Sequence, residues 1–273
     1  MSWTSSAVAL SLALTIAQTQ APPTQQPPPK PWEPTVGMAG KDVVWVPTTA
    51  QMVEKMLDVA KVTPQDFVID LGSGDGRMII AAAKRGARAL GVEYTPEMVE
   101  HARKNAREAG VEGKAQFLQG DMYEADISKA SVLALFLLPH NLDKLKDKFL
   151  ALKPGSRIVL NTYEITGWEP DEKTTVEGDC TSWCTVLLHF VPAKVAGTWR
   201  LGDGELRLGQ DFQKVSGELT AGGRTTQVEG RLKGEEITLK IGGVDYTGRV
   251  TGDRMQGTRG ANKQDWSATR APK

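Results

Sequence analysis

From residue 48 to about residue 164, short apolar runs alternate with segments in which apolar residues recur at helical spacing. The apolar runs are typical of buried strands: FVIDLG, LGVE, QFLQGD, SVLALFLL and RIVLNTYE. Helical patterns lie before or between most of these runs: TTAQMVEKMLDVAKV, MIIAAAKRG, residues 96–109 and NLDKLKDKFLALK. Strands that alternate with helices indicate parallel strands joined by crossover helices. We therefore predict an α/β fold with a doubly wound, Rossmann-like sheet.

Two further patterns refine this sheet. Residues 173–191 read as a hairpin, with TTVE and CTVLLHFV on either side of a turn around Gly178 and Asp179. The hairpin would add two antiparallel edge strands, which makes seven strands in all. Thr48 and Gln51 form a capping-box pattern, so we expect the first helix to begin at Thr48.

The pattern changes after Pro192. Helical spacing disappears, and short alternating runs are separated by turns such as GDG, AGG, KGEE and TGD. Seven or eight short strands of this kind predict a small all-β barrel or sandwich. We accordingly assign residues 41–192 to the α/β domain and residues 193–273 to an all-β accessory domain.

The first forty residues differ from both domains. Residues 7–17, AVALSLALTIA, form an apolar run that is too short to span a bilayer comfortably, so residues 1–21 are predicted to be a signal or tethering segment. Residues 22–40 are a Pro-rich linker. The residues before the apolar run carry no Lys or Arg, so a disordered tail or a misplaced start codon stays open. Export or membrane tethering, with possible envelope association, is the favoured location, and the cytoplasm is the alternative.

Charge and cysteine content narrow the functional classes. Lys plus Arg and Asp plus Glu both number 33, so the chain has no overall attraction to nucleic acid, and no nucleic-acid partner is expected. The two cysteines, Cys180 and Cys184, cannot form a zinc site alone, and no metal signature is present. On one extended strand they would lie about 13 Å apart, so a disulfide between them requires a turn.

A glycine-rich turn, Gly72-Ser73-Gly74-Asp75-Gly76, follows the first predicted strand. Such a turn between strand and helix lets a ligand contact the backbone, as in dinucleotide-binding folds. The dinucleotide spacing G-x-G-x-x-G fails here because Arg77 stands at the third glycine position. Asp70, two residues before the turn, would also repel a diphosphate at the helix N-terminus.

Carboxylates stand at the ends of three successive predicted strands: Asp70, Glu93 and Asp121. The carboxyl ends of parallel strands meet at one edge of the sheet, so we expect these groups to converge on one crevice. An acidic crevice suits S-adenosylmethionine, which carries an ammonium and a sulfonium and has no phosphate. Glu93 would accept the ribose hydroxyls and Asp121 the adenine amino group, with Met122 against the ring. The alternatives are a helix cap for Asp70 and solvated loop positions for Glu93 and Asp121.

The other predicted cofactor contacts flank these carboxylates. They are Gly72, Ser73 and Gly74 in the turn and Thr48 before the first helix. Trp45, Thr48 and Thr49 precede the sheet and would close over the methionine end of the cofactor, or else serve packing and helix capping.

Residues 44–191 resemble class I S-adenosylmethionine-dependent methyltransferases. More narrowly, VPTTAQMVEKMLDVAKV, then DFVIDLGSGDGR, and LFLLP after the fourth strand are similar to a family of small lysine methyltransferases. This family includes the mitochondrial enzymes that act on the adenine nucleotide translocase and on the ATP synthase c subunit. The resemblance does not reach the all-β domain. It implies an N-methyltransferase that moves a methyl group from S-adenosylmethionine to a protein lysine, with cofactor contacts at Asp70, Gly72, Gly74, Glu93 and Asp121.

The residues that act on the acceptor are less sharply indicated. His140 follows the fourth strand and would help to deprotonate an amine, although a helix-capping or surface histidine has the same appearance. Tyr163 and Glu164 follow the fifth strand and would orient the acceptor. Methyltransferases of amides and exocyclic amines place Asp or Asn before Pro-Pro-aromatic after the fourth strand, and Leu137-Leu138-Pro139-His140 departs from that pattern.

Two other functions are weighed against this one. The first is a non-catalytic S-adenosylmethionine-binding module whose β-domain recruits an envelope partner. The second is a nicotinamide-dependent oxidoreductase, which Asp70 and Arg77 disfavour because both residues break the dinucleotide pattern.

Overall fold

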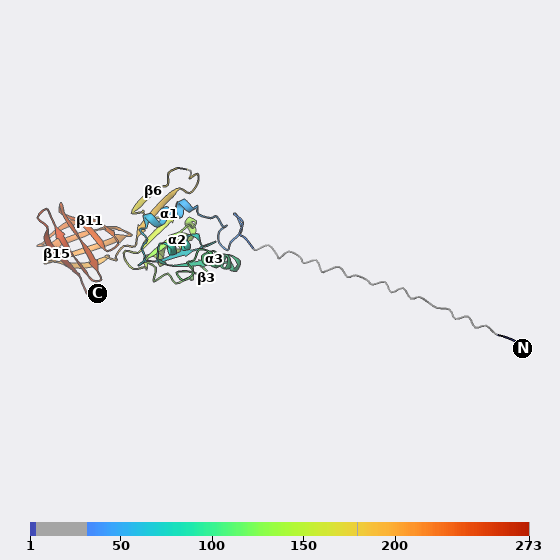
Figure 1. Ribbon diagram of the computed structural model, residues 1–273. Coiled ribbons are helices and arrows are strands. Elements are labelled where there is room, and N and C mark those ends of the chain that lie inside the picture. Colours follow the sequence, from blue (N-terminus) through green and yellow to red (C-terminus); the bar gives the residue numbers. More distant parts are fainter. Residues whose placement is uncertain (4–31, 179, 273) are drawn as a thin grey trace. The chain divides into compact units, whose positions relative to one another are not determined.

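The computed structural model of the chain describes residues 1–3, 32–178 and 180–272 (Figure 1). The predicted targeting segment therefore lies, apart from residues 1–3, outside the described residues, as does the part of the predicted linker up to residue 31. Among the residues that are described, none belongs to a helix that is both long enough and apolar enough to cross a membrane.

The first sheet has seven strands in the order β3-β2-β1-β4-β5-β7-β6. Its strands are β1 Phe67–Leu71, β2 Arg88–Glu93, β3 Ala115–Gln119, β4 Val132–Leu135, β5 Arg157–Asn161, β6 Glu172–Thr175 and β7 Thr185–Phe190. Strands β1 to β5 are parallel, whereas β7 runs antiparallel to both β5 and β6. The doubly wound seven-stranded sheet and its antiparallel edge hairpin are thus confirmed.

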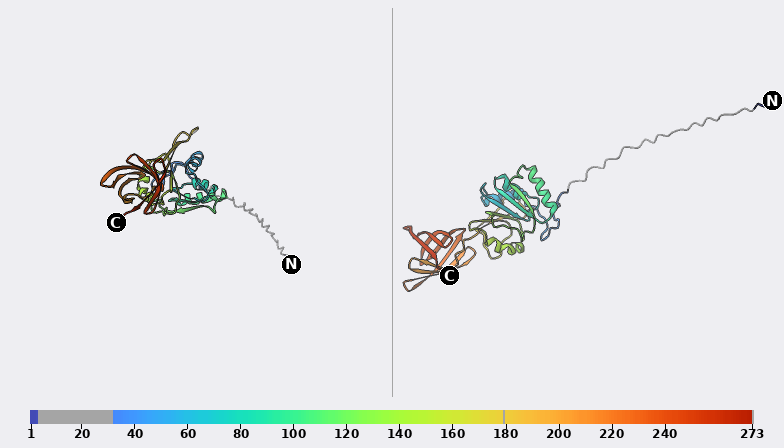
Figure 2. Two further views of the ribbon diagram at one scale, coloured as in Figure 1. Left: turned by 90° about the vertical axis from the view of Figure 1, so that its left-hand side faces the viewer. Right: turned by 90° about the horizontal axis from the view of Figure 1, so that it is seen from below.

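Four helices cover the two faces of this sheet: α1 Ala50–Val59, α2 Arg77–Lys84, α3 Pro96–Glu108 and α4 Pro139–Leu150. Side chains alternate along each strand, so every strand contributes to two cores. In β1, Val68 packs with α1, α2 and α3, while Ile69 and Leu71 pack with α4 on the opposite face. Figure 2 shows the helices layered on the sheet from two further directions.

Two predicted boundaries are corrected by the structure. Thr49, not Thr48, is the N-cap of α1, because the Thr49 hydroxyl accepts the backbone N–H of Met52 at 3.3 Å. Strand β4 ends at Leu135 rather than at Leu138, since α4 already begins at Pro139 and the residues between form the turn. The four-residue strand is buried along its whole length.

The second sheet is a closed barrel of eight antiparallel strands, orange to red in Figure 1. Its strands are β8 Gly197–Leu201, β9 Gly204–Asp211, β10 Lys214–Ala221, β11 Arg224–Lys233, β12 Glu236–Ile241, β13 Val244–Thr251, β14 Arg254–Arg259 and β15 Gln264–Arg270. The predicted all-β domain is confirmed, and of the two architectures left open it is the barrel. Alternate residues point inward, and Trp199, Leu206 and Met255 are fully buried there.

Strand glycines let the barrel backbones approach closely. A Cβ at Gly217 would lie 1.9 Å from the carbonyl oxygen of Arg207, and one at Gly257 would lie 1.9 Å from that of Thr247. Larger residues at these two positions would push neighbouring strands apart.

The loop between β6 and β7 contains a disulfide, whose formation the sequence alone did not decide. Cys180 and Cys184 are bonded, with their Cα atoms 5.8 Å apart, and Cys184 immediately precedes β7. The expectation that a bridge requires a turn agrees with this loop. Trp183, inside the disulfide-closed loop, adopts a left-handed backbone conformation with φ +56°.

Candidate cofactor and acceptor site

Two adjoining pockets lie at the carboxyl edge of the first sheet, where the strand order reverses between β1 and β4. This position is the usual ligand crevice of open α/β sheets. The larger pocket encloses about 260 Å³ and the smaller about 50 Å³. Trp45, Val46, Gly72 and Phe136 line both, so a ligand that occupies both pockets passes these residues.

The glycine-rich turn forms the floor of the smaller pocket. Gly72, Gly74 and Gly76 have φ values of +76°, +53° and +83°, which side-chain-bearing residues rarely adopt. A Cβ at Gly76 would lie 2.6 Å from the ring of Phe117, so Gly76 allows the close packing of helix on sheet, a role that the dinucleotide pattern gives to its third glycine. At Gly72 the nearest group to such a Cβ is the Leu137 side chain, at a van der Waals distance of 3.6 Å. Gly72 lines both pockets, so a ligand there can approach its backbone.

Asp70 is buried at the carboxyl end of β1, with 8% of its surface exposed. Burial raises the pKa of this carboxyl well above its usual value, and the negative charges of Glu93 and Asp75 raise it further. Within the described part of the chain, no cation or hydrogen-bond donor offsets these effects on Asp70. Among the described residues, Asp70 therefore has no positive partner of its own, whereas its neighbour Asp75 pairs with Arg77.

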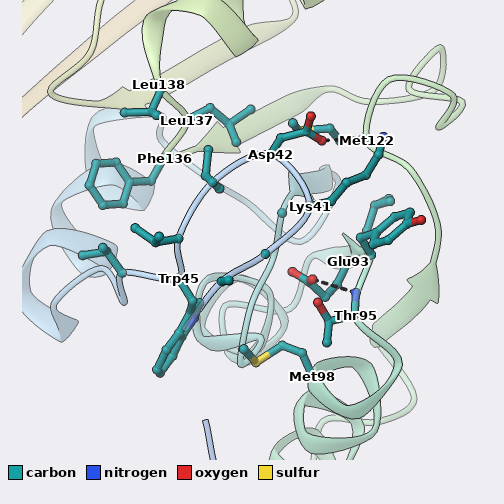
Figure 3. Close-up of a pocket in the computed structure, with 18 of the residues that line it drawn as sticks. Lys41, Asp42, Trp45, Glu93, Thr95, Met98, Met122, Phe136, Leu137 and Leu138 are labelled. Carbon is teal, nitrogen blue, oxygen red and sulfur yellow. Dashed lines mark hydrogen bonds and ion pairs between the residues drawn. The ribbon is translucent and has the colours of Figure 1, made fainter. Parts of the chain in front are cut away.

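Glu93, at the end of β2, organises the loops around the pocket. One carboxylate oxygen accepts the backbone N–H of Gly74 at 3.1 Å, and the other accepts that of Thr95 at 3.0 Å. Figure 3 shows the contact with Thr95 at the pocket wall. These bonds join the glycine turn to the end of the neighbouring strand. Glu93 lines the larger pocket, where the sequence placed its contact with a ribose.

Ser73 is a second polar group in the turn. Its hydroxyl is buried and has no hydrogen-bond partner among the described residues. A Cβ at Gly91 on β2 would lie 2.5 Å from this hydroxyl, so Gly91 is the residue that makes room for Ser73.

Asp121 and Met122, after β3, both line the larger pocket. The ammonium of Lys41 lies 2.5 Å from the Asp121 carboxylate, and this contact lowers the pKa of Asp121. The same ammonium stands 5.3 Å from the centre of the Tyr94 ring and 5.8 Å from that of Tyr123. From the sequence we predicted that the Asp121 carboxylate accepts a hydrogen bond from the adenine amino group. In the structure this carboxylate is instead bonded to Lys41.

Residues 38–46 cover the larger pocket. A short antiparallel bridge between Ala39 and Val44 shapes this segment, which the predicted domain boundary after residue 40 divides. Trp45 lies over Gly74, because a Cβ on that glycine would come within 2.5 Å of the indole nitrogen. Figure 3 shows Lys41 and Trp45 of this segment with the pocket residues that follow β2 and β4.

Thr48 lines the smaller pocket together with Asp70, Ser73 and Gly74. Its carbonyl oxygen accepts a hydrogen bond of 2.7 Å from Arg77, whose guanidinium also pairs with Asp75. Arg77 therefore links the segment before α1 to the glycine turn. The predicted cofactor residues are thus all brought to the two pockets, and their contacts with a cofactor stay a prediction.

The three residues predicted to act on the acceptor lie in different places in the structure. Tyr163 lines the larger pocket. His140 lies exposed in the first turn of α4 and lines neither pocket, because the chain turns away after Leu138. Glu164 is exposed and forms an ion pair of 3.1 Å with Lys173, likewise outside both pockets. Of the three candidates only Tyr163 lines the crevice, and a role of any of them toward the acceptor stays a prediction.

Sequence reasoning missed three pocket groups. Phe136 and Trp183 stand beside Tyr163 in the lining of the larger pocket, and Lys41 closes it at Asp121. Phe136 carries a usable signal, since it directly follows β4, where ligands bind in such sheets. Trp183 stands between two cysteines, but its place in the pocket depends on a turn that no periodicity describes.

Comparison with known proteins agrees with this architecture. The family profile of the ANTKMT methyltransferase domain matches residues 70–172. A protein-lysine N-methyltransferase of Saccharolobus islandicus is 45% identical over 152 residues, which cover 55% of this chain and 94% of that protein. The Mus musculus lysine N-methyltransferase of the ATP synthase c subunit is 36% identical over 140 residues, which cover 51% of this chain and 56% of the mouse protein. The chain therefore spans little more than half the length of this mouse relative.

A solved structure is similar over the same region. The RNA methyltransferase of Salinibacter ruber, crystallised with S-adenosylhomocysteine, is 43% identical, with a TM-score of 0.51. The match covers 55% of this chain and 96% of that chain. Together with the near-complete coverage of the archaeal relative, these matches confirm the resemblance inferred from the sequence motifs. The chain belongs to the methyltransferase family of the ANTKMT methyltransferase domain and of these protein-lysine N-methyltransferases.

Proposed function

We propose that this protein is an enzyme that transfers a methyl group from S-adenosylmethionine to the side-chain amine of a lysine in a protein. The observation that carries the proposal is Asp70, a buried carboxylate with a raised pKa and no positive partner in the described chain. An isolated buried charge is costly, and a bound cation removes that cost. S-adenosylmethionine supplies such a cation.

The residues of the crevice fit this cofactor better than a dinucleotide. Asp70 and Glu93 would place negative charge beside a diphosphate near the start of α2, where Asp75 already balances Arg77. The carboxylates of Asp70 and Glu93 favour a ligand with an ammonium and a sulfonium. The Ser73 hydroxyl, which has no partner among the described residues, offers a polar contact for that ligand, and Gly72 lines both pockets. Glu93, Asp121 and Met122 would hold the nucleoside portion in the larger pocket.

When bound, the cofactor supplies an activated methyl group on a sulfonium, and the transfer is an in-line displacement. The chain's own contribution is to hold donor and acceptor in line and to exclude water. The acceptor amine must be neutral to attack, and a free lysine has a pKa near 10.4. Apolar and aromatic side chains around Phe136, Leu137 and Tyr163 disfavour the charged amine by desolvation. No covalent intermediate with the protein is needed.

A binding experiment tests the cofactor assignment. Calorimetric titration of the full chain with S-adenosylmethionine and with S-adenosylhomocysteine is expected to give saturable binding of both. Titration with NADH is the matched control and is expected to give none. Binding of NADH in place of the two sulfur nucleosides would refute the assignment.

A labelling experiment tests the acceptor. The relatives are named for protein lysines, whereas the Salinibacter structure is named for RNA. The balanced charge of this chain supports a protein acceptor, because RNA binding relies on a positive surface. Labelled S-adenosylmethionine is incubated with the full chain and an extract of the source cells. Protein lysine methylation predicts label that resists nuclease, is lost to protease and is recovered as methyllysine.

The same labelling separates an enzyme from a non-catalytic module. A module that only binds S-adenosylmethionine, with the barrel recruiting an envelope partner, would bind the cofactor and transfer no label to any protein. Label that is lost to nuclease instead of protease would point to the RNA activity named for the Salinibacter protein.

We also propose that the protein is exported or tethered to a membrane. The apolar run at residues 7–17 supports this location, and so does the Cys180–Cys184 disulfide, since disulfides persist in oxidising compartments. Fractionation of the source cells, with mass spectrometry of the two cysteines, tests it. A cytoplasmic protein with reduced cysteines would contradict the proposal.

A further inference from the structure

Three aromatic side chains from distant parts of the chain gather on one side of the larger pocket. Phe136 follows β4, Tyr163 follows β5, and Trp183 lies in the disulfide-closed loop before β7. The rings of Phe136 and Tyr163 are stacked, with centres 5.9 Å apart. The ring of Trp183 meets Phe136 edge-on, with centres 5.7 Å apart. We call these three residues the aromatic corner.

The aromatic corner reaches from the crevice to its mouth. Phe136 lines both pockets, so it adjoins the place where the two halves of a bound cofactor would meet. Trp183 is 42% exposed, which is high for a large apolar side chain that also lines a pocket. A side chain that enters from solvent would therefore pass Trp183 before it reaches Phe136.

Trp183 is held in place by two connections. Its indole N–H donates to the Tyr163 hydroxyl at 3.1 Å. The disulfide between Cys180 and Cys184 closes the five-residue loop that carries it, and Trp183 has the positive φ that this loop requires. An exposed tryptophan on an open loop would sample many orientations, whereas these two connections restrict it to the pocket wall.

We propose that the aromatic corner is the acceptor site of the enzyme, that it receives the cationic side chain of the lysine, and that the disulfide positions Trp183 for this purpose. Tryptophan is the aromatic residue that attracts ammonium groups most strongly, followed by tyrosine and phenylalanine. The exposed indole recruits the charged lysine, and the half-buried end at Phe136 strips part of its water before transfer. This inference rests on the proposed function, because it places the acceptor of that reaction.

The test uses n-butylammonium, which has the length and charge of a lysine side chain. The full chain, labelled with ¹⁵N and saturated with S-adenosylhomocysteine, is titrated with this cation while the indole N–H resonances are recorded. The Trp183 resonance is identified from the Trp183→Phe variant. It is expected to shift saturably with n-butylammonium and to shift much less with n-butanol, which is similar in length but uncharged.

Variants separate the parts of the proposal. Trp183→Ala is expected to weaken n-butylammonium binding about five-fold. Trp32→Ala is the matched control, because Trp32 is 41% exposed and lines neither pocket, and its binding is expected to be unchanged. Replacing Cys180 and Cys184 together by serine is expected to weaken the binding of the cation and to leave the affinity for S-adenosylhomocysteine as it was.

The outcomes distinguish this inference from the proposed function. Failure of S-adenosylhomocysteine to bind the unmodified chain would refute the cofactor assignment and, with it, the acceptor site. Normal S-adenosylhomocysteine binding with a Trp183 resonance that ignores n-butylammonium, or responds equally to n-butanol, would overturn the aromatic corner alone. Unchanged cation binding in the double serine variant would overturn the role of the disulfide.

Discussion

Strand β1 has an aspartate just before its amino end and another near its carboxyl end, and both are buried, with Asp66 6% exposed and Asp70 8%. Asp66 accepts hydrogen bonds from the backbone and hydroxyl of Thr63 and from the Ser131 hydroxyl, and it pairs with Arg157. Its pKa is lowered by these contacts, although burial opposes them. The pKa of Asp70 is raised instead, by burial and by neighbouring negative charges.

This difference suggests how to distinguish a carboxylate that stabilises the fold from one that binds a ligand. Asp66 and Asp70 are the same residue type and have similar exposed fractions, and they lie at opposite ends of β1. What differs is whether the chain supplies the positive charge and the donors that a buried carboxylate needs. At Asp66 the fold supplies them. At Asp70 the residues that the structure describes do not, which is why we propose that a bound ligand supplies the partner.

The largest expected effect is on the structural end of β1. Asp66→Asn removes the charge that faces Arg157 and is expected to lower the free energy of unfolding by about 3 kcal/mol. Chemical denaturation at neutral pH measures this change. Because the folded pKa of Asp66 lies below its unfolded value, its contribution is present above the unfolded pKa and is lost as pH falls through the folded one. If the Asp66→Asn variant is as stable as the unmodified chain, the contrast between the two ends disappears.

A buried histidine on β7 shows the same cost of burying an unpaired charge, here for the protonated form of a base. His189 is fully buried against Trp168, and burial lowers its pKa to about 4. Its unfolded pKa is about 6.5, so between these values the unfolded chain binds the proton and the folded chain does not. The contribution of His189 to stability is therefore expected to fall by about 3 kcal/mol as pH drops from about 6.5 to about 4, and the raised pKa of Asp70 opposes part of this loss. Denaturation curves across this range test the slope, and His189→Leu is expected to flatten it.

At the ligand end, Asp70→Asn is expected to act in opposite directions on binding and on stability. Affinity for S-adenosylmethionine should fall about a hundred-fold, since a buried carboxylate that would meet a cation is lost. At pH values where Asp70 is ionised, the ligand-free protein should become more stable, because the substitution removes an unpaired buried charge. Calorimetry and thermal denaturation measure the two effects. Retained affinity would show that the cation site lies elsewhere.

A related effect follows from the raised pKa of Asp70. A bound cation favours the ionised carboxylate, so cofactor binding is expected to release a proton wherever Asp70 is protonated in the free protein. Calorimetric titration in buffers of different ionisation enthalpy measures this proton. The Asp70→Asn variant, which cannot release it, is the control.

The smallest expected effect is at Lys41, beside Asp121. Lys41→Met removes the ammonium that contacts Asp121 and is expected to raise S-adenosylmethionine affinity by a factor of a few, because the adenine amino group then has no competitor. Calorimetry measures the gain. A loss of affinity in this variant would mean that Lys41 contributes to the cofactor site instead of occupying it.

The sequence predicted the parts of the site that depend on regular structure. Glu93 and Asp121 were placed because parallel strands end at one edge, and the period of the apolar residues located those ends. Asp70 was also predicted as a cofactor contact. That it has no positive partner among the described residues was not predicted, because this depends on side chains from other strands. Lys41 lies 80 residues from Asp121 along the chain, and Trp183 depends on an irregular loop. No local pattern encodes contacts of these two kinds.

Closure of the barrel has a consequence for the order in which the protein forms. Strand β8 pairs with β9 and with β15, so the first barrel strand is joined to the last. All seven strands of the first sheet, by contrast, precede Val191. During synthesis a complete α/β sheet can therefore emerge and pack while β8 still lacks one neighbour. Until the ribosome has delivered β15, one side of β8 presents unpaired backbone N–H and C=O groups, and an open strand edge of this kind favours wrong pairing.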